Sequence, residues 1–459
     1  MKQQNTNLGT EKIGSLLFKL SMPAIIAQMI NLLYNLVDRI YIGRIPGVGG
    51  DALTGVGVTA PLLMIISAFA ALIGSGGAPN AAISMGKGDN KTAEKILGNS
   101  VSMIVIISIF ITLFVSIYKE SILTAFGASA QTMSYASAYI GVYVLGTIFV
   151  QCGLGLNIFI TAQGFAKVSM KTVLIGAITN IILDPIFIFV FKMGVTGAAL
   201  ATVISQGISA FWVLYFLTGN QTVLKIKLEN LKPNFRIIGK TLALGVSPFI
   251  MQSTESLIAI TYNTSLLRYA GDTAVGAMTI LLSSMQFCLL PLMGLSQGMQ
   301  PIISFNYGAR NAKRIKQTFK STLVIAMGYT TTLCLFLMFF PSFFAKLFTN
   351  EQAIIEYVTW SLRIFMSASF LMGAQLVCQQ TFISLGNATS SLFLALLRKI
   401  FLLLPFILIF PHFFSDKALG VIVAQPSADV IAVATTIILF HFQFNKAMKE
   451  IESPLTSKA

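Results

Sequence analysis

The sequence predicts an all-α membrane protein of twelve transmembrane helices in two six-helix lobes, and three observations support this prediction. First, the 459 residues are 55% hydrophobic and only 10% charged, with a mean hydropathy of +0.80, whereas a soluble domain carries about 25% charged residues. Second, apolar segments long enough to cross about 30 Å of hydrocarbon recur along the whole chain. Third, the second half of the chain repeats features of the first.

The predicted spans are separated by short polar segments. They cover residues 15–37, 55–80, 97–118, 132–155, 168–191, 194–217, 238–263, 274–297, 318–340, 354–377, 390–411 and 419–443. The fourteen residues before the first span are polar and carry no cleavage site, so we expect the first span to act as its own insertion signal. No sizeable soluble domain is predicted.

The basic residues indicate the orientation. If both termini are cytoplasmic, the inner segments hold 21 Lys and Arg, the outer loops hold seven, and Arg363, Arg398 and Lys399 fall within spans. The positive-inside rule therefore predicts cytoplasmic termini. The net charge of +15 then faces the cytoplasmic leaflet, and no nucleic-acid partner is implied.

The internal repeat divides the chain. Gly50-Asp51 recurs as Gly271-Asp272, Ile83-Ser84 as Ile303-Ser304, and Pro185 as Pro405, at offsets of 220 or 221 residues. We therefore expect an N-lobe at 1–217, a basic cytoplasmic linker at 218–237 and a C-lobe at 238–459. Six spans per lobe give both lobes the same orientation, related by a pseudo-two-fold axis along the membrane normal with a cavity between them.

The first span carries a polar stripe. At 100° per residue, Asn31, Tyr34 and Asp38 fall on one face, with Gln28 and Asn35 at its edges. A charged carboxylate near the bilayer midplane costs roughly 2.5–3.5 kcal/mol. This face is therefore expected to line a protein interior or a wet cavity.

The fifth and sixth spans carry further oxygen ligands. Asn180 and Asp184 share a face at i, i+4, and Pro185 frees the carbonyl of Ile181. In the sixth span the polar stripe consists of Thr202, Ser205, Gln206 and Ser209. Such groups could hold a small hard cation, although serines of this kind also bond to neighbouring helices. Burying a carboxylate costs too much free energy for its only role to be a hydrogen bond between helices.

The C-lobe spans leave more alternatives open. Glu255, which shares a face with Gln252, could be a second coupling or substrate-binding carboxylate, or a structural partner of Arg363 or of another buried polar group. Asp429 could support a helix break or act in function. Arg363, Arg398 and Lys399 could line a cavity or snorkel to the interface.

Several classes of protein are disfavoured. The sequence contains no Walker A motif and no nucleotide fingerprint, so ATP is not expected to power it. Its four cysteines fit no zinc or disulfide framework and are expected to pack in the core, and its two histidines form no ligand cluster. No nucleophile and base are arranged for catalysis, so an enzyme is not expected. Nineteen Met and 36 Phe suit an adaptable apolar cavity.

Four segments together resemble the multidrug and toxin extrusion (MATE) family, in its prokaryotic DinF-like and MepA-like branch. They are residues 23–38, the loop 84–90 with its echo at 304–310, the turn 161–167, and residues 180–185. The resemblance covers nearly the whole chain. It implies the fold shared by MATE transporters and the related flippases of the MOP group, and a secondary active exporter of amphipathic, often cationic drugs and toxic organic compounds.

The resemblance also implies site residues. A cation site for H⁺ or Na⁺ would comprise Asp38, Asn180, Asp184 and Thr202, with no other cofactor. The resemblance also places Tyr34, Tyr139 and Asn157 in a polar network. The polar faces of the spans add four further residues to the predicted substrate and polar network, namely Asn31, Gln206, Gln252 and Glu255. Some relatives have a C-lobe site that pairs a seventh-span Glu with a tenth-span Asp. Glu255 matches the Glu, but the tenth span here contains no acid. We expect a monomer in the lipid bilayer of a prokaryotic cytoplasmic membrane.

The sequence therefore predicts a drug exporter in which a cation replaces the drug as the lobes rock. One alternative is a lipid-linked oligosaccharide flippase of a related fold, whose anionic cargo would require basic residues facing the cavity; Arg363 and Arg398 could supply them. The other alternative is a membrane-embedded enzyme.

Overall fold

The computed structural model describes residues 8–453, which are helical throughout apart from short connections. The α-helices are α1 (Ile13–Gly43), α2 (Gly49–Gly86), α3 (Asn90–Ala125), α4 (Met133–Tyr143), α5 (Thr147–Gln151), α6 (Asn157–Ala162), α7 (Ala166–Pro185), α8 (Gly194–Thr218), α9 (Phe235–Gly308), α10 (Ala312–Phe339), α11 (Pro341–Lys346), α12 (Gln352–Phe365), α13 (Met372–Ser384), α14 (Ala388–Leu396), α15 (Leu404–Ile409) and α16 (Lys417–Glu452). The 3₁₀ turns are η1 (Val144–Gly146), η4 (Leu228–Leu231), η5 (Ser369–Leu371) and η7 (Phe410–His412), and the π-helical turns are η2 (Cys152–Leu156), η3 (Ile186–Val190) and η6 (Leu397–Leu403).

The helices match the predicted spans in order. Within residues 8–453, ten helices are long and apolar enough to cross a membrane, and α12 taken together with η5 and α13, which are bent by 49°, meets the same criterion. α9 has 74 residues, but Gly271 at φ 73° and ψ −167° breaks it into two rods. With α9 divided at Gly271, the predicted all-helical transmembrane fold is confirmed.

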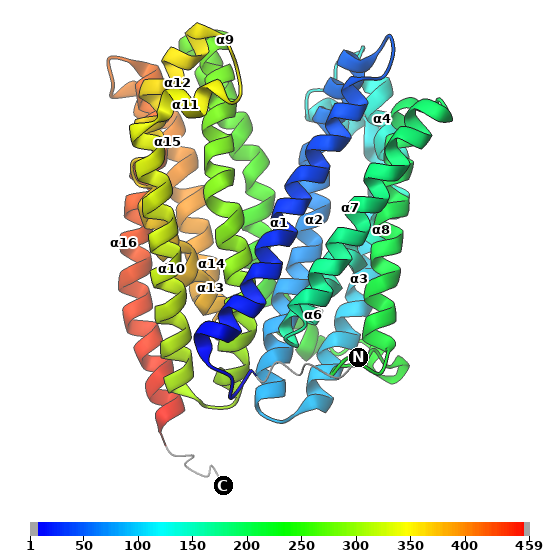
Figure 1. Ribbon diagram of the computed structural model, residues 1–459, viewed down its shortest axis with the longest axis vertical. Coiled ribbons are helices and arrows are strands. Elements are labelled where there is room, and N and C mark those ends of the chain that lie inside the picture. Colours follow the sequence, from blue (N-terminus) through cyan, green and yellow to red (C-terminus); the bar gives the residue numbers. More distant parts are fainter. Residues whose placement is uncertain (1–7, 454–459) are drawn as a thin grey trace.

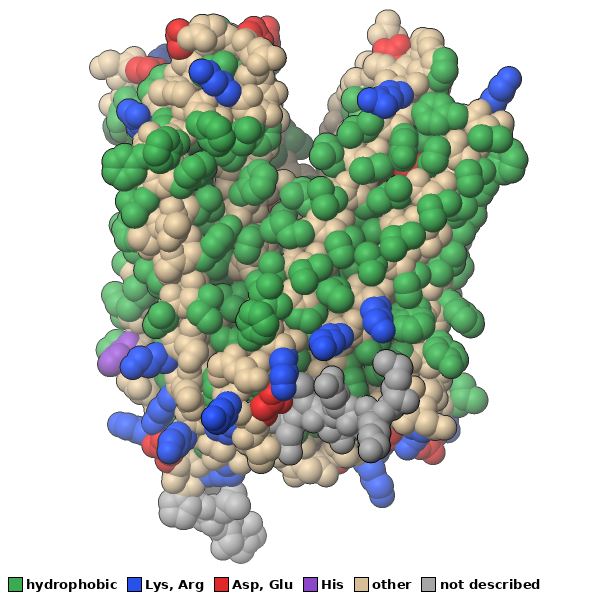
Figure 2. All heavy atoms as spheres, in the orientation of Figure 1, with side chains coloured by type: hydrophobic (Ala, Val, Ile, Leu, Met, Phe, Trp, Pro, Cys, Tyr) green, Lys and Arg blue, Asp and Glu red, His purple; other side chains and the backbone are tan. Residues whose placement is uncertain are grey.

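The helices gather into two bundles. Figure 1 shows α1–α8 and α9–α16 side by side at one end of the molecule and spread apart at the other, with the start of α1 and the end of α16 at the closed end. Figure 2 shows the same separation as a notch between the bundles. Apolar side chains cover the middle of the visible face, and basic side chains gather toward the closed end, as expected for a membrane protein.

Helix α1 crosses between the bundles (Figure 1). Its first turns pack into the apolar core formed by α9–α16. Ser21 Oγ donates to the carbonyl of Leu295 at 3.2 Å, and Arg314 Nη2 donates to the carbonyl of Leu8 at 3.1 Å. The remainder of α1 packs along α7. One helix is therefore fastened to the second bundle at its start and to the first bundle near its end.

Glycines bring the backbones of α2 and α9 together toward the closed end. A Cβ at Gly245 would meet the carbonyl of Leu72, and a Cβ at Gly308 would meet the carbonyl of Ile83. Small residues let membrane helices approach closely enough for extensive van der Waals contact. We call this contact the glycine seam.

The sequence repeat corresponds to repeated loop geometry. Gly88 and Arg310, 222 residues apart, both have positive φ, at 79° and 55°. Each turn is followed by a helix cap: Asp89 accepts from the Thr92 amide at 3.0 Å, and Asn311 accepts from the Arg314 amide at 3.2 Å. A cap satisfies amides that lack intrahelical partners.

The segment between the bundles is tied to the first one. Gln163 Oε1 accepts from the Thr222 hydroxyl at 2.8 Å and from the amides of Val223 and Leu224 at 2.9 and 2.8 Å. Glu94 pairs with Lys227 at 2.6 Å. The predicted basic linker is therefore packed against α1–α8.

Replacing Gly245 or Gly308 by Ala is expected to separate the glycine seam. Overpacking costs about 1–3 kcal/mol, whereas an unhindered Gly→Ala change in a helix stabilises by roughly 0.5–1 kcal/mol. Thermal unfolding in detergent should therefore give a lower midpoint for both variants than for the native protein.

Gly328→Ala in α10 is the matched control, because a Cβ there meets nothing within 4 Å. Its midpoint should be unchanged or slightly higher. Equal shifts for the seam variants and the control would contradict close backbone packing at the seam.

Candidate functional site

The site in the first bundle is built from α1, α4, α7 and α8. Asp38, which is partly exposed, lies near the end of α1 in side-chain contact with Asp184 on α7. Asp184 is fully buried. Two carboxyl groups 146 residues apart in the sequence therefore face one another inside the bundle.

Amide and hydroxyl groups surround Asp184. Asn180 Nδ2 donates to Asp184 Oδ1 at 3.2 Å and lies 3.4 Å from Thr202 Oγ1 on α8. The Thr202 hydroxyl donates to the carbonyl of Ala198 at 3.0 Å. The four residues predicted to form a cation site are thus brought together.

The local sequence explains where Asp184 sits. Pro185 has no amide hydrogen, so it cannot bond to the carbonyl one turn earlier, that of Ile181. α7 ends at Pro185 and continues as the π-helical turn η3. Single π turns are frequent at functional sites, and this one places the carboxyl group where the regular helix stops.

The carboxyl groups have no ion-pair partner, and several oxygens of the site have no hydrogen-bond donor. Within residues 8–453, Asp38 and Asp184 form no ion pair with a basic side chain; the neighbouring Arg39 is exposed. Three buried oxygens in the same range also have no donor, namely Asp38 Oδ1, Asp184 Oδ2 and Asn180 Oδ1. Two like charges about 4 Å apart repel by about 4 kcal/mol at an effective dielectric constant of 20.

This arrangement favours a cation. A proton shared between the carboxyl groups would remove the repulsion, and a hard cation would satisfy the same oxygens, because such cations prefer oxygen ligands. No group of three or more His, Cys, Asp or Glu side chains that could hold a metal occurs in the described part of the chain.

Tyrosines close one side of the site. Tyr139 on α4 is buried within hydrogen-bonding reach of Thr202, and Tyr34 lies close enough to both carboxyl groups to interact electrostatically with them. Tyr143 stacks on Tyr139, with ring centroids 6.0 Å apart and an interplanar angle of 16°. Sequence reasoning missed Tyr143, although its i, i+4 spacing from Tyr139 was a usable signal.

Other predicted network residues have different contacts. Asn157 Nδ2 donates to the carbonyl of Ser169 at 3.2 Å, and Gln206 faces Gly153 in the π turn η2. Asn31 and Gln252 are partly buried. The structure gives these four residues no direct contact with either carboxyl group among residues 8–453.

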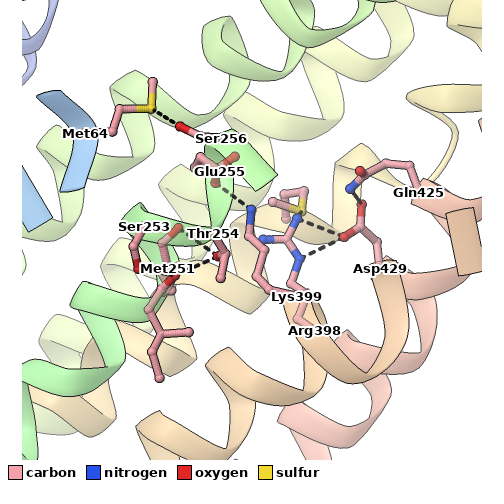
Figure 3. A network of polar contacts seen from close by, with 12 residues as sticks. Met64, Met251, Ser253, Thr254, Glu255, Ser256, Arg398, Lys399, Gln425 and Asp429 are labelled. Atoms are coloured by element: carbon pink, nitrogen blue, oxygen red, sulfur yellow. Dashed lines mark hydrogen bonds and ion pairs between the residues drawn. The ribbon is translucent and has the colours of Figure 1, made fainter. Parts of the chain in front are cut away.

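The second bundle contains a contrasting cluster (Figure 3). Lys399 Nζ lies 2.5 Å from Glu255 Oε1. Arg398 donates to Asp429 Oδ1 at 2.9 Å, and Gln425 Nε2 donates to Asp429 Oδ2 at 2.8 Å. Both basic residues belong to the π-helical turn η6, just before Pro405, the counterpart of Pro185.

The structure decides between alternatives that the sequence leaves open. Arg398 and Lys399 do not snorkel, because both are buried and paired with acids. Glu255 pairs with the buried Lys399 and not with Arg363, which is exposed and donates to the carbonyl of Met338 at 3.1 Å. In both cases the partner was set by helix packing, which the sequence does not reveal.

The chain is similar to known proteins. The family model MatE matches residues 23–186 and 248–409. The multidrug export protein MepA of Staphylococcus aureus strain N315 is 27% identical over 380 residues, covering 82% of this chain and 83% of MepA.

Solved structures share the fold. A MATE crystal structure in the bent conformation superposes with a TM-score of 0.92 at 24% identity, covering 99% of this chain and all of the other. An outward-facing multidrug resistance MATE transporter of the MOP superfamily gives 0.89 at 23% identity, covering 98% of this chain and all of the other. The resemblance seen in the sequence is confirmed, and the chain belongs to the MatE family.

Proposed function

We propose that this protein is a secondary active exporter of small organic molecules, including amphipathic cationic drugs, that exchanges its cargo for a cation bound at Asp38 and Asp184. The observation that carries the proposal is the contact between two carboxyl groups inside the first bundle without a basic partner. The name of its MepA relatives, multidrug export protein, supports the cargo class.

The proposed orientation places the closed end in the cytoplasm. The 21 inner and seven outer basic residues support it through the positive-inside rule, as does the gathering of basic side chains at the closed end (Figure 2). Both termini are then cytoplasmic. The notch opens outward, and the glycine seam closes the inner side.

The proposed cycle follows from charge. With the drug bound and the notch open outward, a proton or sodium ion enters at the partly exposed Asp38 and neutralises or reorganises the Asp38–Asp184 pair. This weakens the hold on a cationic drug, which leaves. The lobes then rock, the ion is released to the cytoplasm, and a new drug enters.

The energy is sufficient. A potential of about 100 mV acting on one charge supplies about 2.3 kcal/mol, equivalent to a drug gradient of roughly forty-fold at about 1.4 kcal/mol per tenfold. A monovalent cationic drug exchanged for one ion moves no net charge. Its export would depend on the ion gradient alone.

The alternatives are less well supported. A flippase for an anionic lipid-linked sugar needs free basic residues, but Arg398 and Lys399 are paired with acids and Arg363 is bound to a backbone carbonyl. A membrane-embedded enzyme is disfavoured because the comparisons give transporters. We expect a monomer to suffice, since the proposed cation site lies within one bundle.

Asp38→Asn and Asp184→Asn are each expected to abolish ion-driven drug efflux from proteoliposomes, because a single carboxyl group cannot reproduce the shared site. Asp51→Asn is the matched control: this acid lies in the exposed first turn of α2, and its loss should leave efflux intact. Native efflux rates in both site variants would refute the proposed coupling.

Imposing the sodium and pH gradients separately should identify the coupling ion. We expect one gradient alone to drive efflux, and a monovalent cationic drug to show little response to an added membrane potential. An efflux rate that is the same with and without each gradient would exclude secondary transport.

A labelling experiment tests the orientation. The four native cysteines are buried, so an impermeant maleimide should react only with an introduced, exposed cysteine. Lys87→Cys, in the connection between α2 and α3, should be labelled from the cytoplasmic side, and Arg44→Cys from the outside. The reverse pattern would invert the proposed orientation.

A further inference from the structure

The acids of the two bundles differ in their partners. Asp38 and Asp184 contact each other and have no basic partner within residues 8–453, whereas Glu255 pairs with Lys399 and Asp429 pairs with Arg398. The first pair carries up to two uncompensated negative charges. The second cluster has two acids and two bases, so it is neutral without any added ion.

The two ion pairs of the second bundle also differ from each other. Arg398 and Asp429 are 7% and 2% exposed, and Gln425 occupies the second oxygen of Asp429. Gln425 Oε1 in turn accepts from the hydroxyl of Tyr262 at 3.2 Å. The Arg398–Asp429 pair is therefore buried, and both oxygens of Asp429 have hydrogen-bond partners, as expected of a structural ion pair.

The Glu255–Lys399 pair is enclosed on one side only. Lys399 is 6% exposed, while the side chain of Glu255 is 45% exposed and uses one oxygen for the pair. The next residue, Ser256, lies with its Oγ 3.1 Å from Met64 Sδ on α2 (Figure 3). Glu255 is therefore an accessible carboxylate at the boundary between the bundles, with an ammonium group behind it.

Chain position connects this pair with the cation site. Lys399 lies in the π turn that precedes Pro405, and Asp184 lies directly before the equivalent Pro185, which is followed by a π turn. The corresponding segments of the two repeats, each with a proline and a π turn, thus supply a carboxylate in the first bundle and an ammonium group in the second.

We propose that Lys399 is a built-in counter-cation for Glu255: its ammonium group stands where an exchangeable ion would otherwise bind, so that the second bundle takes up no coupling ion. This inference rests on the proposed cation site in the first bundle. It explains why an accessible acid can persist in the second bundle while only one site couples transport.

The proposal predicts that removing the charge of Lys399 creates a cation site. Purified protein is titrated with ²²Na⁺, and proton uptake over one fixed pH step is compared between variants so that shared titrating groups cancel. Asp38→Asn combined with Asp184→Asn should bind no coupling ion. Adding Lys399→Gln to that background should restore one ion per molecule, and adding Glu255→Gln should remove it again.

Two control variants test whether charge is responsible. Lys399→Arg keeps the positive charge and should restore no binding in the Asp38→Asn, Asp184→Asn background. Arg398→Gln removes a neighbouring positive charge, but its partner Asp429 is enclosed, so no ²²Na⁺ should bind. Binding of either ion restored by Lys399→Arg, or of ²²Na⁺ restored by Arg398→Gln, would overturn the assignment to Lys399.

A second measurement does not depend on the folding of Lys399 variants. Glu255→Gln in the otherwise native protein should leave the number of bound ions at one. A loss of one bound ion would show that Glu255 itself holds an exchangeable ion, and would overturn the proposal.

The outcomes distinguish this inference from the proposed function. If Asp38→Asn with Asp184→Asn still binds the ion, the proposed coupling site is wrong. Suppose instead that the double variant binds no ion, and that adding Lys399→Gln restores no ion binding although the protein is folded as judged by gel filtration. The proposed coupling site would then stand, but the role of Lys399 as a counter-cation would be refuted.

Discussion

The contact between Asp38 and Asp184 is the constraint on which the other features of the molecule depend. Burying an ionised carboxylate is costly unless it is paired or neutralised, and here two of them meet with buried oxygens that lack donors. Permanent pairing with a basic residue would remove the cost and also the ability to exchange ions. In the proposed cycle, a labile cation would remove the cost only while it is bound, and the energy of the bundle would then depend on whether the ion is present.

Helix α1 provides a physical route from that site to the arrangement of the bundles. Its first turns are held on the second bundle by Ser21 and by the carbonyl of Leu8, while Asp38 lies against Asp184 in the first bundle. A change in the interaction at Asp38 therefore acts on a helix that is attached to both bundles. The glycine seam is the contact that must part if the inner side is to open.

Much of the fold could be predicted from the sequence, because hydrocarbon thickness sets span length and the near-constant offset reveals the repeat. The positions of Asp38, Asn180 and Asp184 were predictable for a related reason: polar groups within apolar spans are few and must meet other polar groups. Pairing across the chain was not predictable. Lys399 lies 144 residues from Glu255, and only the packing of α9 against η6 brings them together. The crossing of α1 likewise depends on tertiary contacts that leave no local periodicity.

Infrared difference spectroscopy of the purified protein offers the most direct test of the central claim, since carboxyl stretching bands report protonation and ion binding. Addition of the coupling ion should change a carboxyl band in the native protein, and that change should vanish in Asp38→Asn and equally in Asp184→Asn, because the two groups act as one site. A band that persists in both variants, or that disappears only in Glu255→Gln, would contradict the account.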